Sequence, residues 1–169
     1  MLRFLAACLV TLACGIVAAA LAVEESVDQK FAAEAAMDSM AEVELGQLAL
    51  DKSNDPRVRE FANQMIQDHS KATMQLENIA KSANVVLPAE PGEKLDIPIS
   101  KLSVLSDKEF DRAYAEAMVE DHQKAVKLFQ QYQRESGNKQ LGAFAQQTLP
   151  VLEGHLRMAQ TLQKNVEGK

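Results

Sequence analysis

Clusters of helix-breaking residues stand at only three places in the chain after residue 22. Asn-Asp-Pro occupies residues 54–56, prolines and a glycine interrupt residues 85–105, and Ser-Gly occupies residues 136–137. The stretches between these clusters repeat apolar residues at helical spacing and are rich in Ala, Glu, Leu and Met, which favour helix. This pattern predicts an all-α fold of four long helices with two tight connections and one long connection.

The predicted helices span residues 28–53, 56–83, 106–136 and 138–166. Asp55 is the expected N-cap of the second helix, with Pro56 at its first position. Ser106 and Glu109 form a capping box at the start of the third helix. Four helices joined in this way make a four-helix bundle, and the long connection favours a ferritin-like crossover between helices two and three. A short turn of helix is expected within the crossover, near Lys101.

Residues 1–22 have the pattern of a signal peptide. Arg3 supplies a short basic segment, residues 4–21 are almost wholly apolar, and small residues at positions 20 and 22 match a cleavage site. The alternative is an uncleaved anchor, since about 20 apolar residues can span a bilayer. We therefore expect a signal peptide at residues 1–22 and one bundle domain at residues 23–169, with no stable membrane span once the signal is cleaved.

The composition argues against several classes of function. Cys8 and Cys14 lie in the predicted signal peptide, so the mature chain has no thiol nucleophile, disulfide or thiolate metal site. The formal net charge is −6 at pH 7, which disfavours nucleic acid and anionic membranes as partners. The sequence shows neither a Gly-rich phosphate loop nor a Ser/His/Asp nucleophile pattern, so it favours a protein that is not an enzyme.

The chain has three histidines, and each lies in a copy of one short motif. The motif is an aliphatic residue, Gln or Glu, Asp or Gly, His, any residue, and then Lys or Arg. The copies lie in residues 65–72, in residues 118–125 and, more weakly, in residues 152–158. His69, His122 and His155 are therefore expected at equivalent positions on three helices.

Counting along the helices places these histidines at one height in the bundle. A rise of about 1.5 Å per residue puts His69 and His122 both about 20 Å from the same end, if the crossover makes their helices parallel. His155 returns to this level on the fourth helix, and Glu42 reaches it on the first. Two other acidic residues of the first helix lie near the same level: Asp38 and, next, Glu44.

Two interpretations of this layer stay open. In the first, Glu42 and the three histidines bind one metal ion, and this mixture of imidazole and carboxylate suits zinc, iron or copper. In the second, the same side chains form a layer of core residues that hydrogen-bond to one another. Both interpretations bury the imidazoles, and burial lowers the pKa of a histidine because it disfavours the charged ring.

Asp68 and Asp121 directly precede two of the histidines, so their side chains point about 100° away around the helix. They are candidates to accept a hydrogen bond from a metal-bound histidine on a neighbouring helix. The alternative is a surface ion pair, because Lys71 and Lys124 lie three residues further along the same helices.

Two further patterns bear on the choice of metal. Di-iron bundles place a Glu three residues before each histidine, so that both ligands face the same way. Here Ile66, Val119 and Leu152 occupy those positions, which argues against ferroxidase or oxygenase chemistry. Methionines also lie within about one turn of the histidines, at Met65, Met118 and Met158. Thioether with imidazole favours copper, although Met is also an ordinary core residue.

Several segments, taken in order, resemble one known family. These are residues 41–46 (Ala-Glu-Val-Glu-Leu-Gly), 61–69, 110–114 (Phe-Asp-Arg-Ala-Tyr), His122 and 148–155. They resemble domain-of-unknown-function family 4142, and the resemblance covers nearly the whole mature chain. It implies a ferritin-like bundle exported by a bacterium to the periplasm or the outer membrane, and it supplies no reaction. Its site positions would carry over as Glu42 and the three histidines.

Two classes of function therefore remain. One is an exported bundle that binds a single transition-metal ion in envelope stress or metal handling. The other is a structural or protein-interaction module of the cell envelope, with other proteins or copies of itself as partners. In that second class the histidine layer only specifies packing.

Overall fold

A computed structural model describes residues 26–91, 99–135 and 137–168 of the chain. Within these residues the fold is all-α and contains no strand, as the sequence predicts. The helices are α1 (Val27–Lys52), α2 (Pro56–Ala83), α3 (Ile99–Ser103), α4 (Asp107–Glu135) and α5 (Lys139–Glu167). None of the helices in this part of the chain combines the length and apolarity needed to cross a membrane. The predicted signal peptide lies outside the described residues.

Polar side chains begin three of the long helices. Ser26, Asp55 and Asn138 accept hydrogen bonds from backbone N–H groups in the first turns of α1, α2 and α5. Pro56 lies in the first turn of α2, where its missing N–H leaves no acceptor unpaired. At the other end of α2, Asn84 adopts a left-handed conformation with φ of 56°, which ends the helix. The predicted boundaries of the second helix are therefore confirmed.

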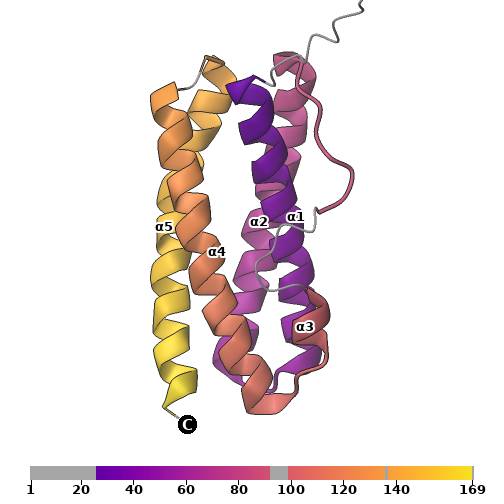
Figure 1. The fold of residues 1–169 in the computed structure, drawn as a ribbon, viewed down its shortest axis with the longest axis vertical. Coiled ribbons are helices and arrows are strands. Elements are labelled where there is room, and N and C mark those ends of the chain that lie inside the picture. Colours follow the sequence, from indigo (N-terminus) through magenta and orange to yellow (C-terminus); the bar gives the residue numbers. More distant parts are fainter. Residues whose placement is uncertain (1–25, 92–98, 136, 169) are drawn as a thin grey trace, which may run out of the picture.

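The connection between α2 and α4 sets the directions of the helices. In Figure 1, α2 and α4 both run from the lower end of the bundle to the upper end, whereas α1 and α5 run downward. Each long helix therefore packs against antiparallel neighbours, because α1 and α5 each contact both α2 and α4. The ferritin-like crossover is confirmed, and the short helix α3 lies within it at the lower end, where the sequence predicts a turn of helix.

Two side chains of α1 hold the crossover at opposite ends of the bundle. The side-chain amide of Gln29 donates to the carbonyl of Val86 over 2.6 Å and accepts from its N–H over 2.8 Å. At the lower end, the ammonium group of Lys52 donates to the carbonyls of Ser103 and Leu105. The crossover is therefore attached to α1 both where it leaves α2 and where it reaches α4.

The apolar core consists of two separate clusters. The upper cluster is built around Phe31 of α1, whose ring stacks on Tyr132 with centroids 3.7 Å apart and also meets Phe129 and Phe144. The lower cluster is centred on aromatic and aliphatic residues of α2, α4 and α5, among them Phe61, Phe110, Tyr114, Met118 and Leu162. Each long helix contributes to both clusters, and the middle of each helix lies between them.

Gly46 lets α1 approach α2 closely. A Cβ at this position would lie 2.7 Å from Cγ1 of Ile66 and 3.1 Å from the carbonyl oxygen of Ala62. We therefore expect Gly46→Ala to lower the free energy of unfolding in urea by about 1–3 kcal/mol, because the two helices must move apart. Gly154→Ala is the matched control, since its nearest neighbour would be Arg157 at 3.9 Å. It should gain up to about 1 kcal/mol from helix propensity. Equal effects of the two substitutions would contradict the close approach.

Candidate metal centre

The three histidines come together between the two apolar clusters. His69 on α2, His122 on α4 and His155 on α5 are buried, with exposed fractions of 6%, 1% and 4%. Their ring centroids are 5.3 to 5.7 Å apart. One ring nitrogen of each lies within 4.8 Å of one nitrogen of each of the others. No other trio of His, Asp or Glu side chains in the described ranges brings ligand atoms this close.

The hydrogen bond of His122 fixes which of its nitrogens carries the proton. Nδ1 lies 2.9 Å from the backbone carbonyl oxygen of Met118, one turn earlier on α4. A carbonyl can only accept, so Nδ1 donates, and in the neutral ring Nε2 keeps a lone pair. This Nε2 is buried and has no hydrogen-bond partner.

His155 has the opposite tautomer for a similar reason. Its Nε2 lies 2.9 Å from a carboxylate oxygen of Asp68, which also accepts from the amide of Gln64 over 2.6 Å. Burial raises the pKa of Asp68, but the hydrogen bonds from Gln64 and His155 outweigh that effect and hold the pKa below its ordinary value. Asp68 is therefore an anion that accepts from Nε2, and Nδ1 of His155 keeps the lone pair, buried and without a partner.

Each of the three rings thus leaves one buried nitrogen unpaired, because Nε2 of His69 also lacks a partner. An unsatisfied buried polar group costs about 1–3 kcal/mol, so three in one layer are a large cost for a domain of this size. Metal-bound histidines commonly donate from the other nitrogen to a carboxylate or a backbone carbonyl. His155 and His122 show these two arrangements, and the three free nitrogens are neutral donors that suit a transition metal.

Glu42 of α1 lies in the same layer but on another side of His122. Its Oε1 is 3.6 Å from Nδ1, the nitrogen that donates to Met118, and its Oε2 is buried without a partner. Glu42 is therefore placed beside the protonated nitrogen of His122, and it is not one of the three ligand groups that converge. Of the other acidic residues near this level, Asp38 is half-buried and lines a cavity with His69, whereas Glu44 is exposed.

The electrostatic environment keeps the rings neutral. Burial is the main cause that lowers the pKa of His69 well below its ordinary value, and the neighbouring histidines add to it. Burial, followed by the charge of His155, lowers the pKa of His122 to about 4. For His155, burial lowers the pKa and the hydrogen bond to Asp68 opposes the change. Neutral imidazole is the form that binds metal ions.

The pKa values of two carboxyl groups beside the rings are raised. Burial raises the pKa of Glu42 well above its ordinary value, and the charges of Asp121 and Asp38 raise it further. Burial also raises the pKa of Asp121 to about 7, with further contributions from Asp38 and Glu120. Asp121 is half-buried on α4 and lines the same cavity as Glu42 and His122. Burial and the charges of neighbouring carboxylates therefore act in the same direction on both groups.

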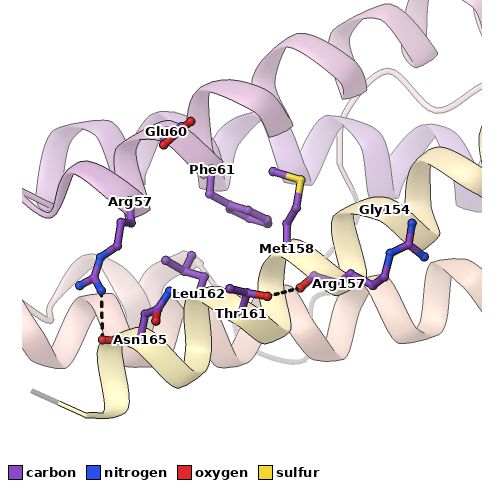
Figure 2. Close-up of a pocket in the computed structure, with 9 residues that line it drawn as sticks. All are labelled: Arg57, Glu60, Phe61, Gly154, Arg157, Met158, Thr161, Leu162 and Asn165. Atoms are coloured by element: carbon purple, nitrogen blue, oxygen red, sulfur yellow. Dashed lines mark hydrogen bonds between the residues drawn. The ribbon is translucent and has the colours of Figure 1, made fainter.

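The methionines near the histidines take ordinary packing positions. Met65 and Met118 are fully buried in the lower cluster. Met158 is 40% exposed and lines a groove of about 550 Å³ between α2 and α5. Figure 2 shows this groove, with Phe61 and Leu162 in its floor and Arg57 and Arg157 beside it. None of the three histidines lines it.

Two hydrogen-bonding groups around the histidine layer were missed in the sequence: the amide of Gln64, which donates to Asp68, and the backbone carbonyl of Met118, which accepts from His122. Gln64 lies four residues before Asp68 on α2, and Met118 lies four residues before His122 on α4. Spacing of four residues places side chains and carbonyls on one face of a helix, so the signal was present in both cases. It is too common among helices to single these residues out.

The buried Glu42 generates a pH-dependent prediction. Its raised pKa means that the folded state binds more protons than the unfolded chain above about pH 4.3, so its contribution to stability is lost as pH rises. Glu42→Gln removes this loss. Relative to wild type, the variant should gain up to about 1.4 kcal/mol of unfolding free energy per pH unit within that window, measured by urea denaturation at pH 5 and pH 8.

The control for this experiment is Glu44→Gln, an exposed position on the same helix. The difference in unfolding free energy between Glu44→Gln and wild type should be the same at pH 5 and pH 8. If the difference in unfolding free energy between Glu42→Gln and wild type were also the same at both pH values, this result would contradict a buried, unpaired carboxyl group in the histidine layer.

The geometry defines a class: a four-helix bundle with a buried layer of three histidines that could hold a metal ion. The chain belongs to the family described as domain of unknown function DUF4142, whose family model matches residues 15–162. Comparison with curated protein sequences gives no match.

Solved structures with the same fold come from DUF305 proteins and from CopM. A presumed secreted DUF305 protein from Streptomyces coelicolor is 18% identical, with a TM-score of 0.71 over 85% of this chain and 94% of that one. A DUF305 fragment from Deinococcus radiodurans is 16% identical, with a TM-score of 0.71 over 82% and 96%. CopM in its Cu(I)-bound form is 16% identical, with a TM-score of 0.70 over 82% and 96%. At these identities the likeness establishes the shared fold.

Proposed function

We propose that this protein binds one transition-metal ion inside its bundle, through His69, His122 and His155, and that it stores or delivers that ion. The observation that carries the proposal is the set of three buried ring nitrogens without partners. A metal ion would satisfy all three nitrogens at once, whereas no protein group in the layer does so. Asp68 and the Met118 carbonyl would hold the rings of His155 and His122 in the orientation that metal binding needs.

Copper is the ion that we favour. Imidazole suits copper, zinc and iron, and among divalent ions of the first transition series Cu²⁺ binds most tightly to a given set of ligands. CopM, which shares the fold, is known in Cu(I)-bound, Cu(II)-bound and Ag-bound forms. Non-haem iron sites commonly include a carboxylate ligand, and Glu42 lies beside the protonated nitrogen of His122 instead. Zinc is the second candidate.

Storage or delivery fits the space around the rings better than catalysis. The two cavities that adjoin the histidines have volumes of about 50 and 30 Å³. Each could hold only a few water molecules, since one needs roughly 10–15 Å³ of such volume. Neither of these two cavities has room for an organic substrate.

We also infer that the protein acts outside the cytoplasm, in the handling of metal in the cell envelope. The pattern of residues 1–22 supports export, as does the description of the DUF305 protein from Streptomyces coelicolor as presumed secreted. A chain whose cysteines all lie in residues 1–22 also suits an oxidising compartment.

The test is isothermal titration of the untagged, metal-free protein (residues 23–169) with Cu²⁺ and with Zn²⁺. We expect one tight equivalent of Cu²⁺, which disappears in a His69→Gln, His122→Gln, His155→Gln triple variant. Asp68→Asn should keep the stoichiometry but weaken binding by about 10–100-fold, because His155 loses its anionic partner. Asp51→Asn, at an exposed position on α1, should bind as wild type does.

The alternative is a structural or interaction module whose histidines only specify packing. It predicts no tight equivalent in the wild type, or the same Cu²⁺ binding in the wild type and the folded triple variant. Circular dichroism of each variant confirms that it is folded before titration. Either result would refute the metal site.

A further inference from the structure

We propose that cations reach the three histidines through an opening between α1 and α4, and that the acidic rim formed by Asp38 and Asp121 sets the rate of metal binding. This inference rests on the proposed function, and it assigns to the two aspartates a role in attracting and positioning the incoming ion.

A cavity of about 50 Å³ adjoins the histidine layer and is lined by residues of α1, α2 and α4. Its outer part is lined by Asp38 of α1 and by Asp121 and Lys124 of α4; the aspartates are half-buried and Lys124 is exposed. Its inner part is lined by buried side chains, Glu42, His69 and His122. The cavity therefore leads from solvent-accessible carboxylates to two of the proposed ligands.

The inner wall of this cavity offers unpaired polar atoms. Oε2 of Glu42 is buried without a hydrogen-bond partner, and Glu42 is 4% exposed. Nε2 of His69 is likewise buried and unpartnered. A cation that loses its hydration water on the way in needs oxygen or nitrogen atoms to replace it. Glu42 provides such an atom between the rim and the rings.

Acidic side chains outnumber basic ones at the rim. Asp38 on α1 and Asp121 on α4 are close enough across the gap for the charge of one to act on the other, and Glu120 acts on Asp121 as well. Lys124 is the one cationic side chain among the residues that line the cavity. A concave surface lined mainly by charge of one sign concentrates ions of the opposite sign and speeds their association.

The other approaches to the histidines are less suited to a cation. A second cavity, of about 30 Å³, shares Asp38 and His69 with the first and reaches His155 and Asp68. Most of the other residues that line it are apolar, with Phe129, Val151 and Leu152 among them. The large groove between α2 and α5 carries Arg57 and Arg157 and is not lined by a histidine (Figure 2). Arginine side chains at a mouth would repel a metal cation.

The experiment measures the association rate of Cu²⁺ by stopped-flow quenching of tyrosine fluorescence. The chain has two tyrosines and no tryptophan. Tyr114 lies near the histidine layer, because Phe61 contacts both its ring and that of His122, with centroids 6.1 and 6.4 Å apart. The triple His→Gln variant supplies the baseline for quenching by Cu²⁺ bound elsewhere.

We expect Asp38→Asn with Asp121→Asn to slow association by about tenfold and to flatten its dependence on salt. The matched control is Asp51→Asn with Glu116→Gln, which removes two exposed charges from the same two helices and should leave the rate unchanged. Lys124→Gln should act with the opposite sign and speed association by about threefold, whereas Lys164→Gln at the far end of α5 should not.

The Asp68→Asn variant distinguishes the entry of the ion from its retention at the histidines. It should leave association nearly unchanged and raise the dissociation rate, because it loosens His155 and leaves the rim intact. Association rates that are the same in the rim double variant and its control, or in Lys124→Gln and wild type, would overturn the entrance while leaving the metal site standing. A wild-type protein that binds no Cu²⁺ would refute both the proposed function and this inference.

Discussion

Three imidazole rings buried in the middle of an apolar bundle are the constraint on which this structure depends. They divide the core into an upper and a lower cluster, and every long helix contributes to both. Polar atoms without partners cost free energy, so the two clusters must offset that cost from either side. The crossover serves the same layer, because it makes α2 and α4 parallel and thereby brings His69 and His122 to one height.

The hydrogen bonds around the rings determine which nitrogens of His122 and His155 carry a proton. His122 donates to a backbone carbonyl and His155 donates to an anionic carboxylate, so the other nitrogen of each ring carries no proton and is buried without a partner. On the α1–α4 side, by contrast, Glu42, Asp38 and Asp121 line one cavity together with Lys124. A bound cation would satisfy the nitrogens and also attract these carboxylates. The arrangement therefore suits the binding of an ion better than the packing of a core.

Much of the fold and part of the site could be predicted from the sequence. Helix boundaries follow from local chemistry, as at Asp55 and Pro56, and the crossover follows from its prolines. The common height of the three histidines follows from a constant rise per residue once two helices are known to be parallel. These properties depend on the backbone, which the pattern of residues determines.

Positions that depend on side-chain orientation could not be predicted. Counting placed Glu42 at the right height, but it could not show on which side of His122 the carboxyl group would lie. Asp68 has both a lysine one turn away and a histidine on the next helix, and the structure shows a hydrogen bond to the histidine together with an electrostatic contribution from Lys71. Asp121 belongs to the acidic rim, and this rim could be predicted only if the packing of α1 against α4 were known.

X-ray absorption at the copper edge of the loaded protein tests the central claim most directly. The account predicts one copper ion whose nearest neighbours are three nitrogen atoms with the multiple-scattering pattern of imidazole. That signal should be absent from the triple His→Gln variant. Sulfur neighbours would place the ion on the methionines instead, and a coordination sphere of oxygen atoms without imidazole would place it on surface carboxylates. Either result would contradict a metal site built from the three buried histidines.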